Sequence, residues 1–264
     1  MSDALFSVEN QVVLVSGGSR GIGRSIAQGF AQRGATVIIT GRELSTLEAT
    51  AKEIAGPKKP VTPIVCDVSD LKGISALVER VIADFGRIDT LVNVAGVNRR
   101  KLSADVTEDD WDFILDINLK GPFFLSQAVG KHMTAAGKGS QINVASLNND
   151  RPVLGVLPYA VSKAGMGHMT QSLAMEWGSH GVRVNAIAPG FILTDLTKKL
   201  WSQPTMQQWG HANTPLRRLG QPDDMIGAAI FLASDASAFM TGQILFVDGG
   251  FTAGLMWPID FGKQ

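Results

Sequence analysis

The sequence has a single cysteine, a single tyrosine, no net charge and no apolar run approaching the ~20 residues that span a bilayer. Cys66 alone cannot form an internal disulfide, which is consistent with a reducing compartment. The 24 basic and 24 acidic residues balance to +0, so no overall field attracts nucleic acid or an anionic membrane. The opening MSDALFSVEN lacks the basic and apolar regions of a secretory signal. We therefore expect a cytoplasmic protein that binds neither nucleic acid nor membrane.

The sequence does contain enough apolar residues for a sizeable core, 45% of 264 residues. Strand-like and helix-like patterns of these residues alternate regularly along the chain. Short β-branched runs lie at 11–16, 35–40, 61–66, 90–95, 140–145, 182–187 and 243–248. Segments of helical spacing lie at 21–33, 44–55, 71–85, 109–136, 158–180 and 222–234. The alternation predicts an α/β fold, a Rossmann-type doubly wound sheet of seven parallel strands with helices on both faces.

No linker, charge block or internal repeat divides the chain, so we predict one domain over residues 1–264. The segment from about 191 to 220 lacks a strand pattern and carries Trp201 and Trp209; we predict a lid over a site. The tail Leu255–Pro258 holds a methionine and a tryptophan. Apolar groups of this kind are seldom left in water, so the tail is predicted to lie against the body or a neighbouring subunit. No metal-ligand spacing is visible, and we predict no metal.

The first predicted strand runs directly into a glycine-rich stretch, SGGSRGIG, with Gly17, Gly21 and Gly23. At the carboxyl end of a strand in an α/β sheet, such a turn lets the backbone approach a pyrophosphate at the next helix N-terminus. The spacing is GxxxGxG rather than GxGxxG. The position after the first strand favours a dinucleotide site over an ordinary tight turn.

The same stretch also fits G-x-S-x-G, the nucleophile elbow of serine hydrolases, with Ser19 as nucleophile. That alternative needs an acid and a histidine downstream. The four histidines follow no recognisable pattern, and no strand precedes the elbow to supply an oxyanion loop. A serine hydrolase is therefore the distant alternative.

The end of the second predicted strand reads Thr40-Gly41-Arg42. A fold that prefers NAD usually places an acid here for the ribose 2′-hydroxyl. Gly41 replaces that acid, and Arg42 and Arg20 could bind a 2′-phosphate through forked, charged hydrogen bonds. We therefore predict that NADP(H) is preferred, with NAD(H) possible. Asp67, at the end of the third strand, could accept from the adenine amino group or cap the next helix.

The lone tyrosine lies in PYAVSKAG, residues 158–165, with Lys163 one helical turn after Tyr159. A phenol needs a lowered pKa to exchange protons near neutral pH, and a close ammonium would lower it. Ser146 lies thirteen residues earlier, at the end of the fifth predicted strand. Its hydroxyl could donate to a carbonyl oxygen at the same sheet edge. A serine, tyrosine and lysine in this arrangement behind a glycine loop predict an alcohol–ketone oxidoreductase.

With these motifs the chain resembles the short-chain dehydrogenase/reductase family over essentially its full length. The resemblance is carried by SGGSRGIG, Asp67-Val68, NVAG (93–96), Asn118, Ser146, YAVSK (159–163), Pro189-Gly190 with Thr194, and VDGG (247–250). It implies a relay in which Asn118 holds a water, Ser146 orients the substrate, Tyr159 is the acid/base and Lys163 tunes it. It also implies cofactor contacts by Gly17, Ser19, Arg20, Gly21, Ile22, Gly23, Arg42, Asp67, Val68, Asn93, Ala95, Gly96, Tyr159, Lys163, Pro189, Gly190, Ile192 and Thr194. The family's usual NNAG has Val94 here, a change that we expect a strand to tolerate.

Two longer stretches, NVAGVNRRK (93–101) and the region from 187 to 250, are similar to gluconate 5-dehydrogenases and related deoxygluconate dehydrogenases. That similarity implies a sugar-acid or polyol substrate, which we expect Arg99 or Arg100 to bind, with Arg217-Arg218 of the lid as the alternative. The runner-up is an acyl-carrier-protein ketoreductase or a reductase of another small ketone, and a further alternative is a module that binds NADP without turnover. The resemblance also implies a homotetramer, with helices 109–136 and 158–180 packing across a two-fold axis.

Overall fold

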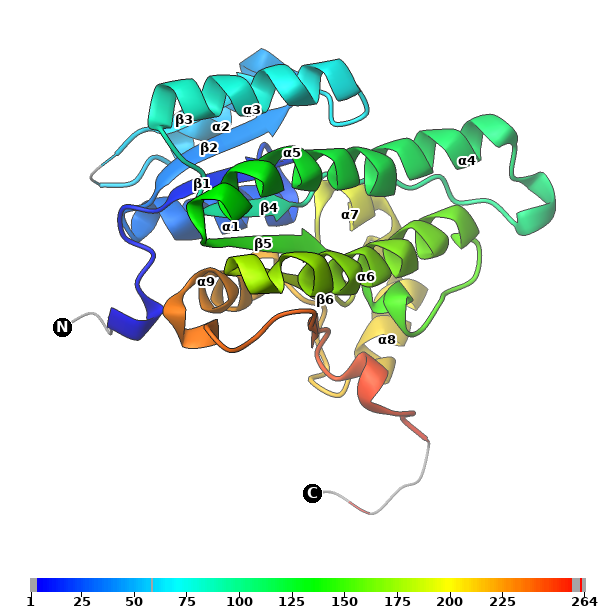
Figure 1. Ribbon diagram of the computed structural model, residues 1–264. Helices are drawn as coiled ribbons and strands as arrows, with labels where there is room; N and C mark the ends of the chain where they lie inside the picture. Colours follow the sequence, from blue (N-terminus) through cyan, green and yellow to red (C-terminus); the bar gives the residue numbers. More distant parts are fainter. Residues whose placement is uncertain (1–3, 58, 258–261, 263–264) are drawn as a thin grey trace.

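The computed structural model describes residues 4–57, 59–257 and 262, and its centre is a parallel sheet in the order β3-β2-β1-β4-β5-β6-β7 (Figure 1). The strands are β1 (Val12–Ser16), β2 (Thr36–Gly41), β3 (Val61–Val65), β4 (Thr90–Asn93), β5 (Gly139–Val144), β6 (Val182–Pro189) and β7 (Ile244–Val247). All six neighbouring pairs are parallel. The order reverses between β1 and β4, which is where doubly wound sheets bind ligands. The predicted seven-stranded fold is confirmed.

Helices cover both faces of this sheet because the strand side chains alternate between two cores. Val13 and Val15 belong to one core, with α1 (Gly21–Gln32), α2 (Leu44–Glu53) and α9 (Ile226–Ala233). Leu14 belongs to the other, with α3 (Leu71–Phe85), α5 (Gly121–Ala136) and α6 (Leu157–Trp177). The strands are therefore apolar on both faces, as their sequences predict.

The predicted helix 109–136 is not continuous. It consists of α4 (Glu108–Leu115), a π-helical turn at Asp116–Lys120, and α5. A π-turn adds a residue to the helix, rotates the side chains that follow, and is frequent at functional sites. Gly121 marks a close approach: a Cβ there would lie 2.1 Å from the Val68 carbonyl oxygen. The predicted helix 222–234 is also divided, with a 3-10 turn at Pro222–Met225 before α9.

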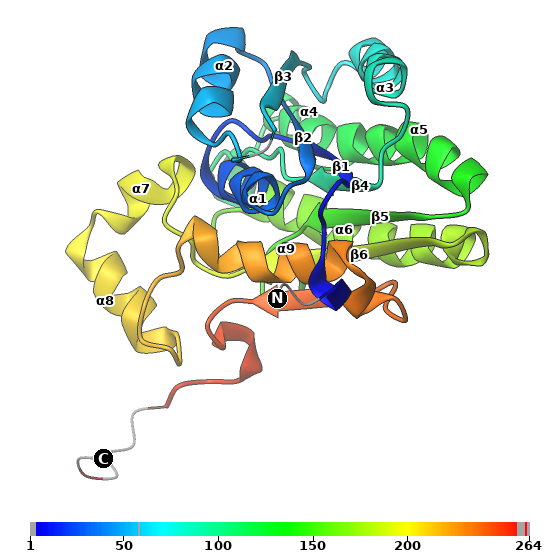
Figure 2. The same cartoon turned by 90° about the vertical axis from the view of Figure 1, so that its left-hand side faces the viewer.

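The segment 191–220 leaves the sheet as predicted and forms α7 (Asp195–Trp201) and α8 (Pro204–Asn213), which project to one side in Figure 2. Its two ends are held together at the base: Leu193 N donates to Gly220 O at 2.9 Å, and Gly220 N donates to Phe191 O at 2.8 Å. Its apolar side chains gather around one ring. Phe191 lies with its centroid 5.2 Å from Trp201, 5.4 Å from Trp209 and 4.7 Å from Phe251.

The described part of the tail is largely exposed, and its packing against the body or a neighbouring subunit stays a prediction. Leu255 is 88% exposed and Trp257 is 71% exposed. The chain runs away from the globule after Phe251 (Figures 1 and 2), since Phe251 already takes the aromatic position beside Phe191. Pro258 lies outside the described residues. None of the described helices combines the length and apolar character needed to cross a membrane.

Candidate active site

The glycine loop is a tight backbone turn at the carboxyl edge of the sheet. Gly17 N and Gly18 N both donate to Thr40 O, at 3.0 and 3.1 Å. Gly17 has a φ of 85°, and a Cβ there would lie 2.6 Å from Ala95 N. A Cβ on Gly23 would lie 2.1 Å from Gly17 O. The turn therefore accepts no side chain at these positions and leaves backbone at the start of α1, which fits a pyrophosphate.

Two unpaired arginines lie at this edge, Arg20 at the end of the glycine loop and Arg42 directly after β2. Arg20 and Arg42 are exposed, and within the described residues neither side chain forms an ion pair or hydrogen bond. Arg24, by contrast, is paired with Glu53. A Cβ on Gly41 would lie 3.5 Å from Ser19 Oγ. The absence of a side chain at Gly41 therefore leaves space between the glycine loop and the end of β2. Two guanidiniums and a hydroxyl at this point fit a phosphate monoester.

Ser19 shows no sign of being a nucleophile. Its backbone carbonyl accepts from Thr50 Oγ1 at 2.9 Å, and no hydrogen bond joins its hydroxyl to any histidine within residues 4–57 and 59–257. The hydrolase alternative therefore gains no geometric support.

Asp67 and Val68 follow β3, with Val68 buried. Asp67 Oδ1 accepts from Ser69 N at 2.9 Å and from Ser69 Oγ at 2.7 Å. The cap of α3 is Asp70, which accepts from Lys72 N. The helix-cap alternative for Asp67 is thus wrong, and its carboxylate closes the turn at the edge of the sheet instead.

Asn93, predicted to contact a cofactor, directs its side chain into the core. Its Nδ2 donates at 2.9 Å to both Ser126 Oγ and Asn143 Oδ1. Asn143 Nδ2 in turn donates to Thr170 Oγ1. This amide nitrogen thus satisfies buried polar groups between the strands and helices, and a cofactor contact by Asn93 stays a prediction.

The four predicted catalytic residues come together where β5 ends and α6 begins. Ser146 Oγ accepts from Asn148 N at 3.2 Å and from Asn148 Nδ2 at 3.1 Å. With its lone pairs engaged, its hydroxyl proton is left to donate, and this hydroxyl is one of the groups that oppose the rise in the pKa of Tyr159 on burial. Lys163 Nζ donates to Val144 O at 2.6 Å and lies 5.8 Å from the centroid of the Tyr159 ring.

Asn118 lies in the π-turn and joins the catalytic group to the NVAG turn. It donates to Val97 O at 2.9 Å and to Ser162 Oγ at 3.1 Å, and it accepts from Val97 N at 2.8 Å. A Cβ on Gly96 would lie 3.5 Å from Asn118 Oδ1 and 3.7 Å from Lys163 Nζ. The open space over Gly96 is therefore walled by both of these side chains.

Asn148 is a functional residue that the sequence reasoning missed. It is 9% exposed, orients Ser146 through two hydrogen bonds, and is itself held because its Oδ1 accepts from Val153 N at 3.1 Å. The only signal in the sequence was its place two residues after Ser146, where a serine commonly accepts from the backbone.

The electrostatics of the phenol differ from the prediction. Burial raises the pKa of Tyr159 above its usual value, and the groups that oppose this are the Ser146 hydroxyl and the Arg100 charge. Burial lowers the pKa of Lys163 to about 8. Lys163 is not among the groups that lower the pKa of the phenol here, since its ammonium donates to the Val144 carbonyl, and its tuning of Tyr159 stays a prediction. The phenol is therefore protonated at neutral pH.

The two predicted substrate arginines have different surroundings. Arg99 Nη1 lies 2.5 Å from Asp109 Oδ2 and 3.2 Å from Asp110 Oδ1, and its guanidinium is 4.0 Å above the Phe113 ring. Arg100 is exposed and, among the described residues, has no ion pair. Arg100 is thus the guanidinium of this pair that is available to a ligand.

The alternative cations of the lid are less available. Arg218 forms two bonds to Asp224, at 2.6 and 2.8 Å. Arg217 Nη1 donates to Ala212 O at 2.8 Å. Both guanidiniums hold the base of the lid in place.

The start of the segment 191–220 lies beside the glycine loop. Thr194 forms a capping box with Thr197 at the start of α7, and its methyl lies 3.4 Å from the position of a Cβ on Gly21. Ile192 is buried, and a Cβ on Gly190 would lie 2.6 Å from the Asp248 Cα. The segment Pro189–Thr194 therefore passes beside the loop and borders the same space.

Comparisons with known proteins agree with this site. The family described as "Enoyl-(Acyl carrier protein) reductase", one of the short-chain dehydrogenase/reductase type, matches residues 17–252. The chain is 36% identical over 251 residues to the gluconate 5-dehydrogenase of Gluconobacter oxydans, covering 95% of this chain and 98% of that protein. It is 40% identical over 247 residues to the D-threitol dehydrogenase of Mycolicibacterium smegmatis, covering 94% and 95%.

A solved structure is also similar. The gluconate 5-dehydrogenase of Burkholderia cenocepacia, in complex with NADP and tartrate, superposes with a TM-score of 0.91 at 35% identity, covering 96% of this chain and 99% of that one. The chain therefore belongs to the short-chain dehydrogenase/reductase family. It is an oxidoreductase that acts on CH–OH groups.

Proposed function

We propose that this enzyme interconverts a secondary alcohol and a ketone on a sugar acid, with NADP(H) preferred and NAD(H) bound less tightly. The observation that carries the proposal is the unpaired Arg100 beside the Ser146–Tyr159 pair. A carboxylate on the substrate would pair with this cation and place the neighbouring carbinol at the phenol. The similarity to dehydrogenases of gluconate and threitol supports the same substrate class.

The cofactor site in this proposal extends along the carboxyl edge of the sheet. The adenosine 2′-phosphate would lie between Arg20, Arg42 and Ser19, the adenine near Asp67 and Val68, and the pyrophosphate on the glycine loop. The nicotinamide would lie against Gly96 and Ile192 and supplies hydride exchange when bound. Its backbone and side-chain contacts are those predicted above: Gly17, Gly21, Ile22, Gly23, Asn93, Ala95, Pro189, Gly190 and Thr194, with Lys163 on the ribose.

Proton management belongs to this chain's own residues. In ketone reduction Tyr159 donates its proton to the developing alkoxide, and in alcohol oxidation it accepts that proton. Ser146, oriented by Asn148, donates to the same substrate oxygen. Asn118 holds the Val97 backbone and would hold the relay water behind Lys163. In this arrangement the substrate oxygen receives two donors that are already in position before it binds.

Arg100→Ala tests the substrate class. We expect the KM for D-gluconate to rise roughly tenfold to a hundredfold, the size of a lost charged hydrogen bond. The KM for D-glucitol, which has CH2OH in place of the carboxylate, is expected to stay within about threefold. Initial rates at 340 nm with NADP measure both.

The matched control is Arg217→Ala, which removes an arginine bonded to its own lid. It is expected to change both KM values alike. Equal KM values of Arg100→Ala and the unsubstituted enzyme for D-gluconate would contradict the sugar-acid proposal, although the oxidoreductase class would stand. A substrate screen in which only simple ketones are reduced would favour the runner-up.

The runner-up, a reductase of ketones on acyl carrier protein, needs a basic face near α4 and α5 for the acidic carrier. Lys120 is one of the two lysines there and is paired with Asp116 at 3.0 Å. That pairing reduces the free charge that this face offers to a carrier protein, and we therefore favour a small anionic substrate.

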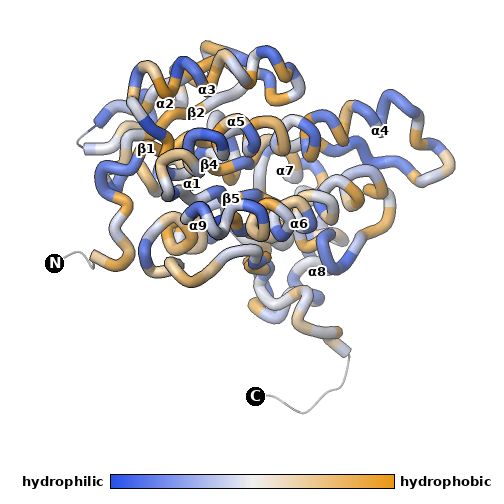
Figure 3. The backbone as a smooth tube through the Cα atoms, in the orientation of Figure 1, coloured by the Kyte–Doolittle hydropathy of each residue, from blue (hydrophilic) through white to orange (hydrophobic). Residues whose placement is uncertain are grey.

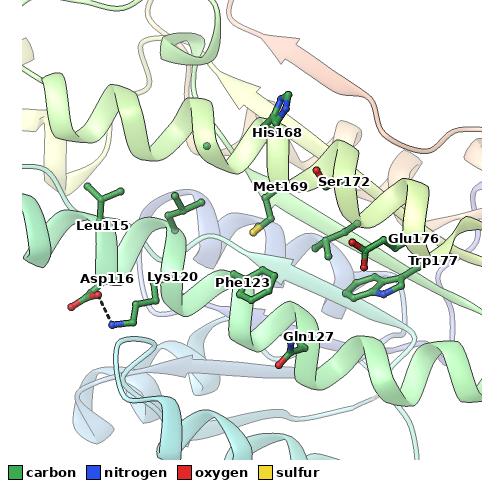
Figure 4. Close-up of a pocket in the computed structure, with 13 residues that line it drawn as sticks. Leu115, Asp116, Lys120, Phe123, Gln127, His168, Met169, Ser172, Glu176 and Trp177 are labelled. Carbon is green, nitrogen blue, oxygen red and sulfur yellow. Dashed lines mark hydrogen bonds and ion pairs between the residues drawn. The ribbon is translucent and has the colours of Figure 1, made fainter.

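We also propose that the chain forms a homotetramer in the cytoplasm. A groove of about 760 Å³ lies between α5 and α6, with Phe123 and Met169 facing each other across it (Figure 4). Its lining is largely apolar, with Leu115, Leu119, Leu173 and Trp177, and it runs along the two helices expected at a two-fold axis. The free, buried Cys66 supports a reducing compartment. Sedimentation equilibrium that finds a mass of 28.1 kDa, that of one chain, would contradict the assembly.

A further inference from the structure

A buried carboxylate lies at the start of α4, outside the catalytic group. Asp110 is 4% exposed and occupies the third position of the helix, where it forms a capping box with Thr107. Its Oδ2 accepts from Thr107 N at 3.1 Å and from Thr107 Oγ1 at 2.9 Å. Thr107 thus provides some of the contacts of the Asp110 carboxylate, and two cationic side chains provide the others.

Those two cations are the neighbours of Arg100. Lys101 Nζ lies 2.5 Å from Asp110 Oδ2, and Arg99 Nη1 lies 3.2 Å from Asp110 Oδ1. Arg99 and Lys101 therefore both contact Asp110, while Arg100, which lies between them in the sequence, forms no ion pair with it.

The segment that contains Arg100 also lies near the catalytic phenol. Lys101 N donates to Gly155 O at 3.0 Å, which ties this segment to the loop that leads into α6 and Tyr159. The Arg100 charge is near enough to oppose the rise in the pKa of Tyr159 that burial causes. The region around the start of α4 is largely hydrophilic in Figure 3, so its order rests on these polar contacts rather than on an apolar core.

The charges also balance to leave one cation. Asp109 and Asp110 neutralise Arg99 and Lys101, while Arg100 has no carboxylate partner within the described residues. The ammonium of Lys101 and the amide of Thr107 hold the pKa of Asp110 well below its usual range, so this carboxylate is negatively charged at neutral pH.

We propose that Asp110 is a positioning residue for substrate recognition: by holding Arg99 and Lys101, it presents Arg100 alone to an anionic group of the substrate. The inference rests on the proposed function, since it assumes that Arg100 receives the carboxylate. Without the Asp110 charge, the side chains of Arg99 and Lys101 would lose the carboxylate that holds them in place. The substrate carboxylate would then no longer meet Arg100 as its one defined donor.

The test is Asp110→Asn, which keeps an acceptor for the capping box but removes the charge. We expect the KM for D-gluconate to rise roughly fivefold to thirtyfold, with kcat and the KM for D-glucitol changed by less than about threefold. The matched control is Asp109→Asn. It removes the charge of the neighbouring carboxylate, which also pairs with Arg99 but is exposed to solvent. Its KM for D-gluconate is expected to stay within about twofold.

A double-mutant cycle separates positioning from simple stability. If Asp110 acts through Arg100, Asp110→Asn raises the KM for D-gluconate no further in an Arg100→Ala background. An additive rise, or a KM that falls because the released cations attract the anion, would overturn the inference. Should Asp110→Asn fail to fold, Lys101→Gln probes the same clamp from an exposed position, and an unchanged KM there would also overturn it.

The two proposals fail in different ways. If Arg100→Ala leaves the KM for D-gluconate unchanged, the substrate class is wrong and the inference falls with it. If Arg100→Ala raises that KM while Asp110→Asn does not, the proposed function stands and only the positioning role is wrong.

Discussion

Tyr159→Phe is expected to lower kcat by roughly 10²–10⁴ in both directions, the range of general acid–base catalysis. The substitution removes one oxygen and keeps the ring, so the affinity for NADPH is expected to stay within about threefold. The Ser146 hydroxyl opposes the rise in the pKa of this phenol, and the chain has no second tyrosine to take over its proton transfer. Stopped-flow or steady-state rates at 340 nm, together with NADPH fluorescence titration, measure the two quantities separately.

The pH dependence adds a second measurement. Because burial raises the pKa of Tyr159, the phenol is the acid form at neutral pH and is ready for ketone reduction. Alcohol oxidation needs the phenolate, so its kcat is expected to rise with pH above neutrality, and Tyr159→Phe is expected to lose this rise. A Phe variant that keeps near-normal kcat and the same pH profile would show that another group carries the proton.

The double variant Arg20→Ala with Arg42→Ala is expected to weaken NADPH binding by about a hundredfold or more. Each arginine contributes a charged hydrogen bond to phosphate, worth about 1.5–3 kcal/mol or roughly tenfold to over a hundredfold in affinity. The affinity for NADH is expected to change by less than about threefold, because that ligand lacks the 2′-phosphate. Fluorescence titration of both cofactors measures the ratio.

Arg24→Ala is the control for this variant, since Arg24 also lies near the glycine loop but is paired with Glu53. It is expected to leave the ratio of NADPH to NADH affinities unchanged. Equal affinity of the unsubstituted enzyme for the two cofactors would refute the assignment of Arg20 and Arg42 to the 2′-phosphate.

The fold could be predicted from the sequence because its signals are local. Strands buried on both faces are written as near-continuous apolar runs, and each was found within two residues of its predicted end. The tight turn after β1 needs a positive φ at Gly17 and room for backbone at Gly23, which only glycine provides. These requirements act on single residues and their neighbours, so a sequence displays them.

Helix continuity was harder to predict. The π-turn at Asp116–Lys120 shifts the helical pattern by one residue only, and so the segment 109–136 still reads as one long helix. The turn depends on contacts from elsewhere: Asn118 bonds to the Val97 backbone, and Gly121 passes against the Val68 carbonyl. Both partners come from other loops of the sheet edge.

The sequence by itself determined the fold class, the glycine loop and the Ser146–Tyr159–Lys163 spacing, since periodicity, chirality and helical repeat are properties of short stretches. The tertiary structure alone decided what each polar group faces. Asn93 turned into the core, and Lys163 turned to the Val144 carbonyl. Of two adjacent arginines, the acids at the start of α4 hold Arg99 while Arg100 stays unpaired. The physical reason is that the electrostatics of a side chain depend on burial and on partners brought close by folding, which adjacent residues in the sequence do not specify.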